Sequence, residues 1–202
     1  MNLESMKALG FVGAILMVIS FAGAAGRLYE GLPLLAGIIL VLIALKGFAD
    51  YYKDKGIFNN SLYGTVIVIV GIVAAILILI ILILPLAPQL KELDWTNMAA
   101  VQEFIRTHLW SFLGPIVGAY LTLVISLIIS AVFFRKSLDA LSTKSGEKMF
   151  ETAGLVWLIG AVLSIILVGF IIIWIAWIII AVGFFSMKTP AETLQPPMQR
   201  SP

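Results

Sequence analysis

Residues 153–185 read AGLVWLIGAVLSIILVGFIIIWIAWIIIAVGFF, and this block decides how many times the chain crosses a membrane. The block has no charged residue over its whole length. About 20 apolar residues cross the bilayer core, which is about 30 Å thick. One straight helix over this block would be about 50 Å long, which is too long for one upright span and short for two. The block therefore predicts either one strongly tilted helix or a tight helical hairpin.

The composition of the whole chain indicates an integral membrane protein. Of the 202 residues, 61% are hydrophobic and 12% are charged, whereas soluble domains have about 25% charged residues. The segments lack the alternating pattern of a transmembrane β-barrel. The sequence therefore predicts an all-α fold, a polytopic helical bundle in the cell membrane with the lipid bilayer around it.

Charge and cysteine content narrow the chemistry that the chain can perform. The net charge of +2 gives no support for a nucleic-acid partner. The chain has no cysteine, which excludes disulfides, thiolate catalysis and Cys-ligated metals. The sequence also lacks a metal-ligand cluster, a phosphate-binding loop and a nucleophile with a base. We therefore expect no catalytic, metal-binding or cofactor-binding residues, and a protein that is not an enzyme.

The apolar segments organise residues 1–188 as a single transmembrane domain. They predict spans at residues 8–25, 32–49, 64–87, 112–134, 153–168 and 170–187. The last two spans divide the long block at a hinge over Val168, Gly169 and Phe170. Residues 189–202 are rich in proline and polar residues, a composition typical of a flexible tail.

The distribution of lysine and arginine favours two crossings of the block over one. These residues are more frequent on the cytoplasmic side of membrane proteins. Six spans place ten Lys and Arg residues on the side of the termini and three on the other side, whereas five spans give eight against five. We therefore predict six spans with cytoplasmic N and C termini, and five spans remain the alternative.

The longest polar connection contains a helical pattern of its own. Residues 97–109 predict an amphipathic extracytoplasmic helix with Met98, Val101, Ile105 and Leu109 on its apolar side. Glu103 and Arg106 are turned away from that side. We expect this helix to lie in the membrane interface or to cap the bundle.

The polar connection at residues 135–151 is expected to be mostly helical. Its pattern extends the fourth helix to Thr143 and starts a new helix at Glu147. Ser145 and Gly146 predict the turn between them, because glycine adopts the backbone conformation that ends helices.

The fourth span has one ordered polar pattern, a stripe of small residues at four-residue spacing. Its members are Gly114, Gly118, Thr122, Ser126 and Ser130. Such a stripe lies on one face of a helix and lets another backbone approach closely, and its hydroxyl groups can bond across the contact. We predict that the stripe is a helix-packing seam inside the bundle. A subunit interface and a pore lining are the alternatives.

Few ionisable residues lie close to the predicted spans. Lys46 lies near the end of the second span, where its side chain can reach the interface. His108 is the only histidine, and its place on a polar connection is more typical of a surface residue than of a ligand or base. A cleft that gathered His108 with Asp94 or Glu103 would instead favour an enzyme.

Several short motifs follow one another in a fixed order along the chain. They are Lys7-Ala8-Leu9-Gly10, Gly13-Ala14-Ile15-Leu16, Ile57-Phe58-Asn59-Asn60, Phe133-Phe134-Arg135-Lys136, Phe150-Glu151-Thr152-Ala153-Gly154 and Gly183-Phe184-Phe185-Ser186. With these motifs, nearly the whole chain up to Lys188 resembles an archaeal, and partly bacterial, family of membrane proteins of unknown function. The resemblance implies a multi-pass prokaryotic membrane protein. It carries no activity and no site residue.

These observations favour a non-enzymatic role for the chain. We expect a structural, assembly or regulatory membrane component that works through helix packing, as a homo-oligomer or with a membrane-protein partner. The alternative is a small channel or transporter for an uncharged solute, because the third, fourth and last spans contain no acid, base or histidine that could couple transport to ions.

Overall fold

The computed structural model describes residues 2–23 and 31–188, and within them every regular element is a helix. The elements are α1 (Leu3–Gly23), α2 (Gly31–Tyr51), α3 (Lys55–Ile83), η2 (Leu84–Leu86), α4 (Ala87–Glu92), α5 (Met98–Ser145), α6 (Met149–Leu163), η3 (Ser164–Ile166) and α7 (Gly169–Ser186). Six helical segments are long and apolar enough to cross a membrane. The expected all-α bundle with six candidate spans is therefore confirmed, while the predicted tail at residues 189–202 lies outside the described residues.

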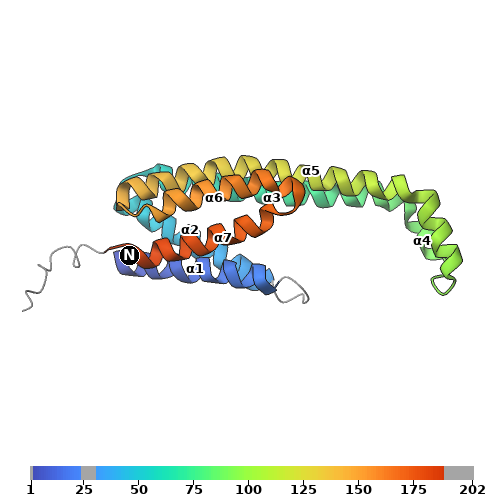
Figure 1. The fold of residues 1–202 in the computed structure, drawn as a ribbon, viewed down its shortest axis with the longest axis horizontal. Coiled ribbons are helices and arrows are strands. Elements are labelled where there is room, and N and C mark those ends of the chain that lie inside the picture. The colour runs from blue at the N-terminus through green and yellow to red at the C-terminus, as the bar shows by residue number, and fades with distance from the viewer. Residues whose placement is uncertain (1, 24–30, 189–202) are drawn as a thin grey trace, which may run out of the picture.

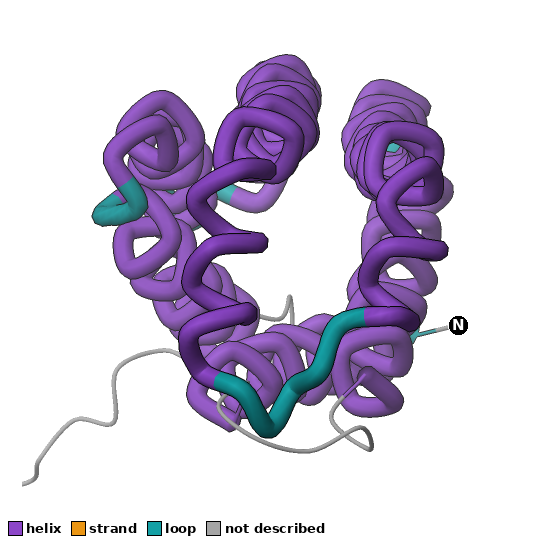
Figure 2. Tube along the Cα trace, turned by 90° about the vertical axis from the view of Figure 1, so that its right-hand side faces the viewer, coloured by secondary structure: helices purple, strands orange, loops and turns teal. Residues whose placement is uncertain are grey.

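The six long helices form a closed ring in which successive helices lie side by side. Each packs on the next in the order α1, α2, α3, α5, α6 and α7, and α7 returns to α1 (Figure 2). Trp174 of α7 stabilises the contact between α7 and α1, because its indole Nε1 donates a hydrogen bond of 3.0 Å to the carbonyl oxygen of Val18. The start of α1 and the end of α7 lie at the same end of the bundle (Figure 1), as an even number of helices that alternate in direction requires.

An aromatic core fills the ring at the end where α1 begins. Phe48 of α2, Phe150 of α6 and Phe184 of α7 are fully buried there. The ring of Phe184 lies 5.9 Å from that of Phe48 and 5.0 Å from that of Phe150. Gly10 of α1 makes room for this cluster, since a Cβ atom there would be 2.6 Å from the Phe184 ring. The hydrophobic effect between helices is weak in lipid, so close van der Waals packing of this kind is what holds apolar helices together there.

The helices α3 and α5 extend far beyond the other four (Figure 1). The 48 residues of α5 correspond to about 72 Å of helix, whereas the 15 residues of α6 correspond to about 22 Å. We call residues 77–119 the arm, because they form the part of this helical pair that lies beyond the α6–α7 turn. The arm contains the end of α3, the short elements η2 and α4, and the first turns of α5.

The expected amphipathic helix at residues 97–109 is the start of α5 and not a separate element. Asn97 caps this helix by accepting hydrogen bonds from the backbone N–H groups of Ala99 and Ala100. No glycine or proline follows until Gly114 and Pro115, so nothing ends the helix before the span begins. The segment therefore projects along the arm and does not fold back to cap the bundle.

The connection between α5 and α6 follows the sequence expectation. The helix α5 ends at Ser145, and Gly146 has a left-handed backbone with φ of 74°. Glycine adopts this conformation without the steric cost that a Cβ atom would add. The next helix begins at Met149, two residues after the predicted restart.

Candidate functional site

The stripe of small residues on α5 lies partly against α3. A Cβ atom added to Gly71 of α3 would lie 2.2 Å from Ser126 Oγ, so the backbone of α3 packs directly on the Ser126 side chain. One added to Gly64 would lie 3.1 Å from the carbonyl oxygen of Ser130. The α3 side of the contact is thus formed by two glycines seven residues apart, which is two helical turns. We call this contact between Gly64, Gly71, Ser126 and Ser130 the seam.

The outer members of the stripe are less tightly packed. A Cβ atom at Gly118 would meet only Ile78 Cγ2, at 3.9 Å, and one at Gly114 would meet nothing within 4 Å among the described residues. The hydroxyl groups of Thr122 and Ser126 donate to the carbonyl oxygens of Gly118 and Thr122, each at 2.8 Å. They therefore bond within α5, and not across to another helix as the sequence analysis allowed.

Besides Asp139 Oδ1 at the charged end of α5, three buried side-chain atoms have no hydrogen-bond partner among the described residues. They are Ser130 Oγ of α5, Trp157 Nε1 of α6 and Trp177 Nε1 of α7. The two indole rings lie 4.8 Å apart in an edge-to-face arrangement, and Phe134 stacks on Trp157 at 4.9 Å. A buried indole N–H usually finds a partner. The sequence analysis missed this group of donors, because tryptophan in an apolar segment also occurs at membrane interfaces.

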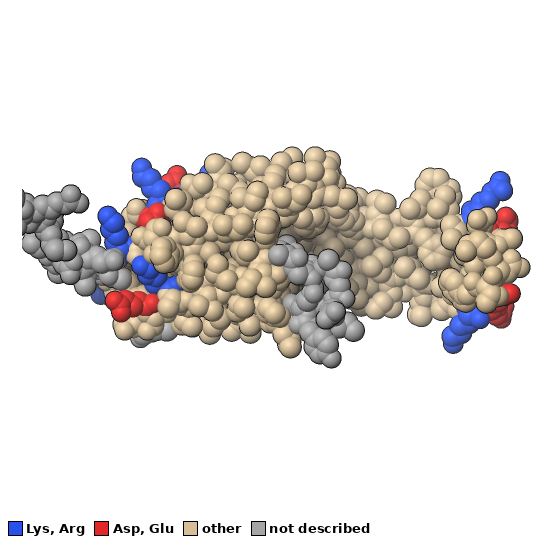
Figure 3. Space-filling view, turned by 60° about the horizontal axis from the view of Figure 1, so that its bottom comes forward, with Lys and Arg blue, Asp and Glu red and all other residues tan. Residues whose placement is uncertain are grey.

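On the face shown in Figure 3, the charged residues of the described part of the chain gather at the two ends, and the described surface between them is uncharged. At the end where α1 begins, Lys46 pairs with Asp50 at 2.9 Å and Arg135 with Asp139 at 3.6 Å. The other end is the tip of the arm, which carries Lys91, Glu92, Asp94, Glu103 and Arg106. This distribution is the one expected of a bundle that passes through a bilayer.

The polar side chains near the tip bond within their own segments. Asp94 accepts a hydrogen bond of 2.6 Å from Thr96 Oγ1, and this bond lowers the pKa of Asp94. Thr107 Oγ1 lies 3.5 Å from Glu103 Oε1. His108 Nδ1 lies 3.0 Å from the carbonyl oxygen of Phe104, one turn earlier. The cleft that would have gathered His108 with Asp94 or Glu103 is therefore not formed by these residues.

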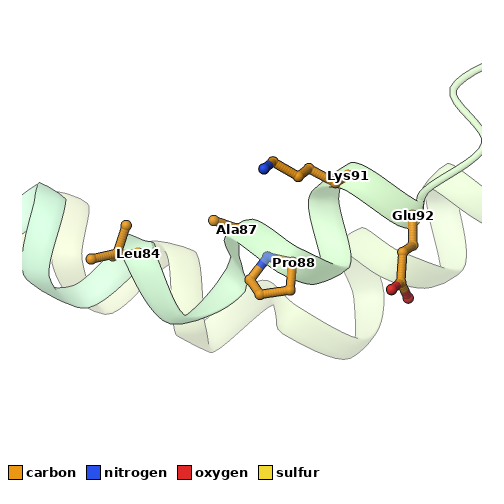
Figure 4. A pocket seen from close by; sticks show the side chains of 5 residues that line it. All are labelled: Leu84, Ala87, Pro88, Lys91 and Glu92. Carbon is orange, nitrogen blue, oxygen red and sulfur yellow. The ribbon is translucent and has the colours of Figure 1, made fainter.

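An open hollow lies on α4 near the tip. It is lined by Leu84, Ala87, Pro88, Lys91 and Glu92. Figure 4 shows that the side chains of Lys91 and Glu92 point in different directions. Within residues 2–23 and 31–188, no group of three or more His, Asp or Glu side chains could hold a metal ion. The hollow therefore offers a mostly apolar surface and not a converging set of polar groups.

Comparison with known proteins places this chain in a family. Residues 33–178 match the model described as "Protein of unknown function (DUF996)". The chain belongs to the DUF996 family. The uncharacterized protein MJ1644 of Methanocaldococcus jannaschii is 30% identical over 187 residues, which cover 93% of this chain and 94% of that protein. No solved structure matches the chain.

The DUF996 match confirms the resemblance inferred from the sequence motifs. The first and last matched residues show which parts of the fold the family model includes. It begins within α2 and ends within α7. It therefore includes the seam, the arm and the three unpartnered donors. The helix α1, which closes the ring against α2 and α7, precedes the matched residues.

Proposed function

We propose that this DUF996 protein is a non-enzymatic assembly or regulatory component of the membrane, and that the arm contacts another protein or a second copy of the chain. The supporting observation is the length of the uncharged part of α5, which runs from the arm into the bundle. Residues 109–134 contain no charge and correspond to about 39 Å of helix. A bilayer core of about 30 Å could cover this length only at a tilt of about 40°, the upper limit seen for membrane helices.

The surface of the arm supports a protein contact at its outer part. Trp110 is 82% exposed, and it lies 25 residues before Arg135, or about 37 Å along the helix. Other large apolar side chains on the arm are also exposed: Ile80, Ile81, Leu82, Leu84, Leu109, Leu113, Ile116 and Val117. When the bilayer starts at the level of Arg135, the outermost of these residues lie beyond the hydrocarbon. Exposed apolar patches beyond the hydrocarbon core are typical of protein interaction sites.

The proposal predicts a specific cross-linked product from the arm. The chain has no cysteine, so single cysteines can be introduced at Trp110 and at Leu109 and coupled to a photoreactive maleimide in native membranes. We expect a discrete protein adduct from these positions, because the protein partner lies beside them. The mass of the adduct measured by electrophoresis and mass spectrometry would distinguish a second copy from a different protein.

A cysteine at Ile159 is the matched control, because this α6 residue is 45% exposed on the short part of the bundle. It should give lipid adducts and no discrete protein band. If Trp110 and Leu109 behave like Ile159, the arm contacts lipid alone and the proposed role is wrong.

A channel or transporter for an uncharged solute is the second candidate. The observation that favours it is the group of Ser130, Trp157 and Trp177, whose polar atoms lie inside the ring without partners among the described residues. These atoms are donors that could bond an acceptor on a passing solute. Purified protein in vesicles should then speed glycerol entry over empty vesicles in a light-scattering assay, and Ser130→Ala should change the rate. Equal rates with and without protein would eliminate this candidate.

A further inference from the structure

The turn between α6 and α7 has an unusually apolar surface. Ile165, Ile166, Leu167 and Val168 are 54, 62, 64 and 51% exposed, respectively. Connections that lie in water are normally polar, because their backbone and side chains bond to the solvent. Here four consecutive large apolar side chains form the outermost part of a hairpin whose two helices carry no charge after Glu151. This composition is typical of a segment surrounded by hydrocarbon.

Several backbone N–H groups of the turn are bonded internally. The N–H groups of Leu167, Val168 and Phe170 donate to carbonyl oxygens of the turn at 2.9, 2.8 and 3.2 Å. The hydroxyl group of Ser164 donates to the carbonyl oxygen of Ala161 at 2.7 Å. Water would satisfy these groups at a membrane surface, but in hydrocarbon each unpaired group costs several kcal/mol. These groups of the turn are therefore satisfied without water, as hydrocarbon requires.

A side chain of the neighbouring helix α5 supplies a further hydrogen bond. The Tyr120 hydroxyl donates to the carbonyl oxygen of Ser164. This oxygen lies just after α6, where carbonyl groups at a helix end have fewer backbone partners. This contact also fixes the level of the turn along α5. Tyr120 is 15 residues from Arg135, so the turn lies about 22 Å from the charged end of the bundle.

When the bilayer core begins at the level of Arg135, its thickness of about 30 Å carries it about 8 Å beyond the turn. If the core is instead placed farther along the arm, the turn lies still deeper within it. In both placements the tip of the hairpin ends inside the hydrocarbon. The helix α5 passes the tip and continues for 22 residues from Ala119 to Met98, so the rest of the protein reaches the far surface without it.

We infer that the α6–α7 hairpin ends within the bilayer and that its tip, residues 165–168, contacts lipid acyl chains. The apolar side chains and the internally bonded N–H groups of the turn both point to hydrocarbon as the occupant. A protein partner in this position would not require the backbone to be satisfied within the turn. The inference does not depend on the function proposed for the arm.

The test uses single cysteines at Ile166 and at Val168 in protein reconstituted into vesicles. An impermeant maleimide added to both sides should label these positions about tenfold or more slowly than a cysteine at Thr96, on the exposed tip of the arm. A nitroxide at either position should collide often with oxygen, which concentrates in hydrocarbon, and rarely with a water-soluble nickel chelate. Nickel collisions should rise when the vesicles are made from lipids with shorter acyl chains.

Two results would overturn the inference. Labelling of Ile166 and Val168 variants at the rate of the Thr96 variant would place the tip in water. Low collision rates with both oxygen and nickel would instead show that protein covers the tip. Two positions are used so that a folding defect in one variant, detected by gel filtration, leaves the other to decide.

Discussion

Gly169→Ala should lower the free energy of unfolding by about 3 kcal/mol or more, at the upper end of the cost of overpacking. A Cβ atom at this position would lie 2.0 Å from the carbonyl oxygen of Gly160 and 2.0 Å from the backbone nitrogen of Ser164. Both neighbours are backbone atoms, so no side chain can rotate to make room. The variant must therefore open the α6–α7 turn, which thermal unfolding in detergent would detect.

Gly114→Ala is the matched control for this substitution. It lies in a helix and has nothing within 4 Å of its added Cβ atom among the described residues. Alanine is favoured over glycine in a helix interior by about 0.5–1 kcal/mol, so this variant should be as stable as the original protein or slightly more stable. If Gly169→Ala and Gly114→Ala unfold at the same temperature, the close backbone approach at the turn does not exist.

Gly71→Ala should destabilise the seam by about 1–3 kcal/mol, and Ser126→Gly should largely reverse this loss. The added Cβ atom would lie 2.2 Å from Ser126 Oγ and 2.3 Å from Ser126 Cβ. Removing the serine side chain opens the space on the opposite helix, so the double variant exchanges the small and large partners across the contact. Thermal unfolding of the two single variants and the double variant completes the cycle.

Gly118→Ala provides the comparison within the same stripe, because its Cβ atom would meet Ile78 at an ordinary contact distance of 3.9 Å. This variant should retain the stability of the original protein. The seam would be refuted if the losses from Gly71→Ala and Ser126→Gly simply add in the double variant. Additive losses are expected only when two residues do not touch.

The α5 half of the candidate site could be predicted from the sequence, and the α3 half could not. Four-residue spacing places Ser126 and Ser130 on one face of a helix whatever surrounds it. The glycines that meet them, Gly64 and Gly71, lie among other glycines of the apolar segments, and nothing in their spacing names a partner helix. The same spacing also does not separate Ser126, which touches α3, from Gly114, which has no neighbour within 4 Å.

The sequence by itself determined the helical class, the six apolar segments and the turn at Gly146, because these depend on local composition and backbone preference. Only the tertiary structure decided that α7 closes the ring on α1, that residues 97–109 continue α5 into an arm, and that Trp157 and Trp177 face inward. The physical reason is that lipid is as apolar as the interior of the bundle. Both faces of a membrane helix can therefore be apolar, so the pattern of hydrophobic residues does not identify which face meets another helix.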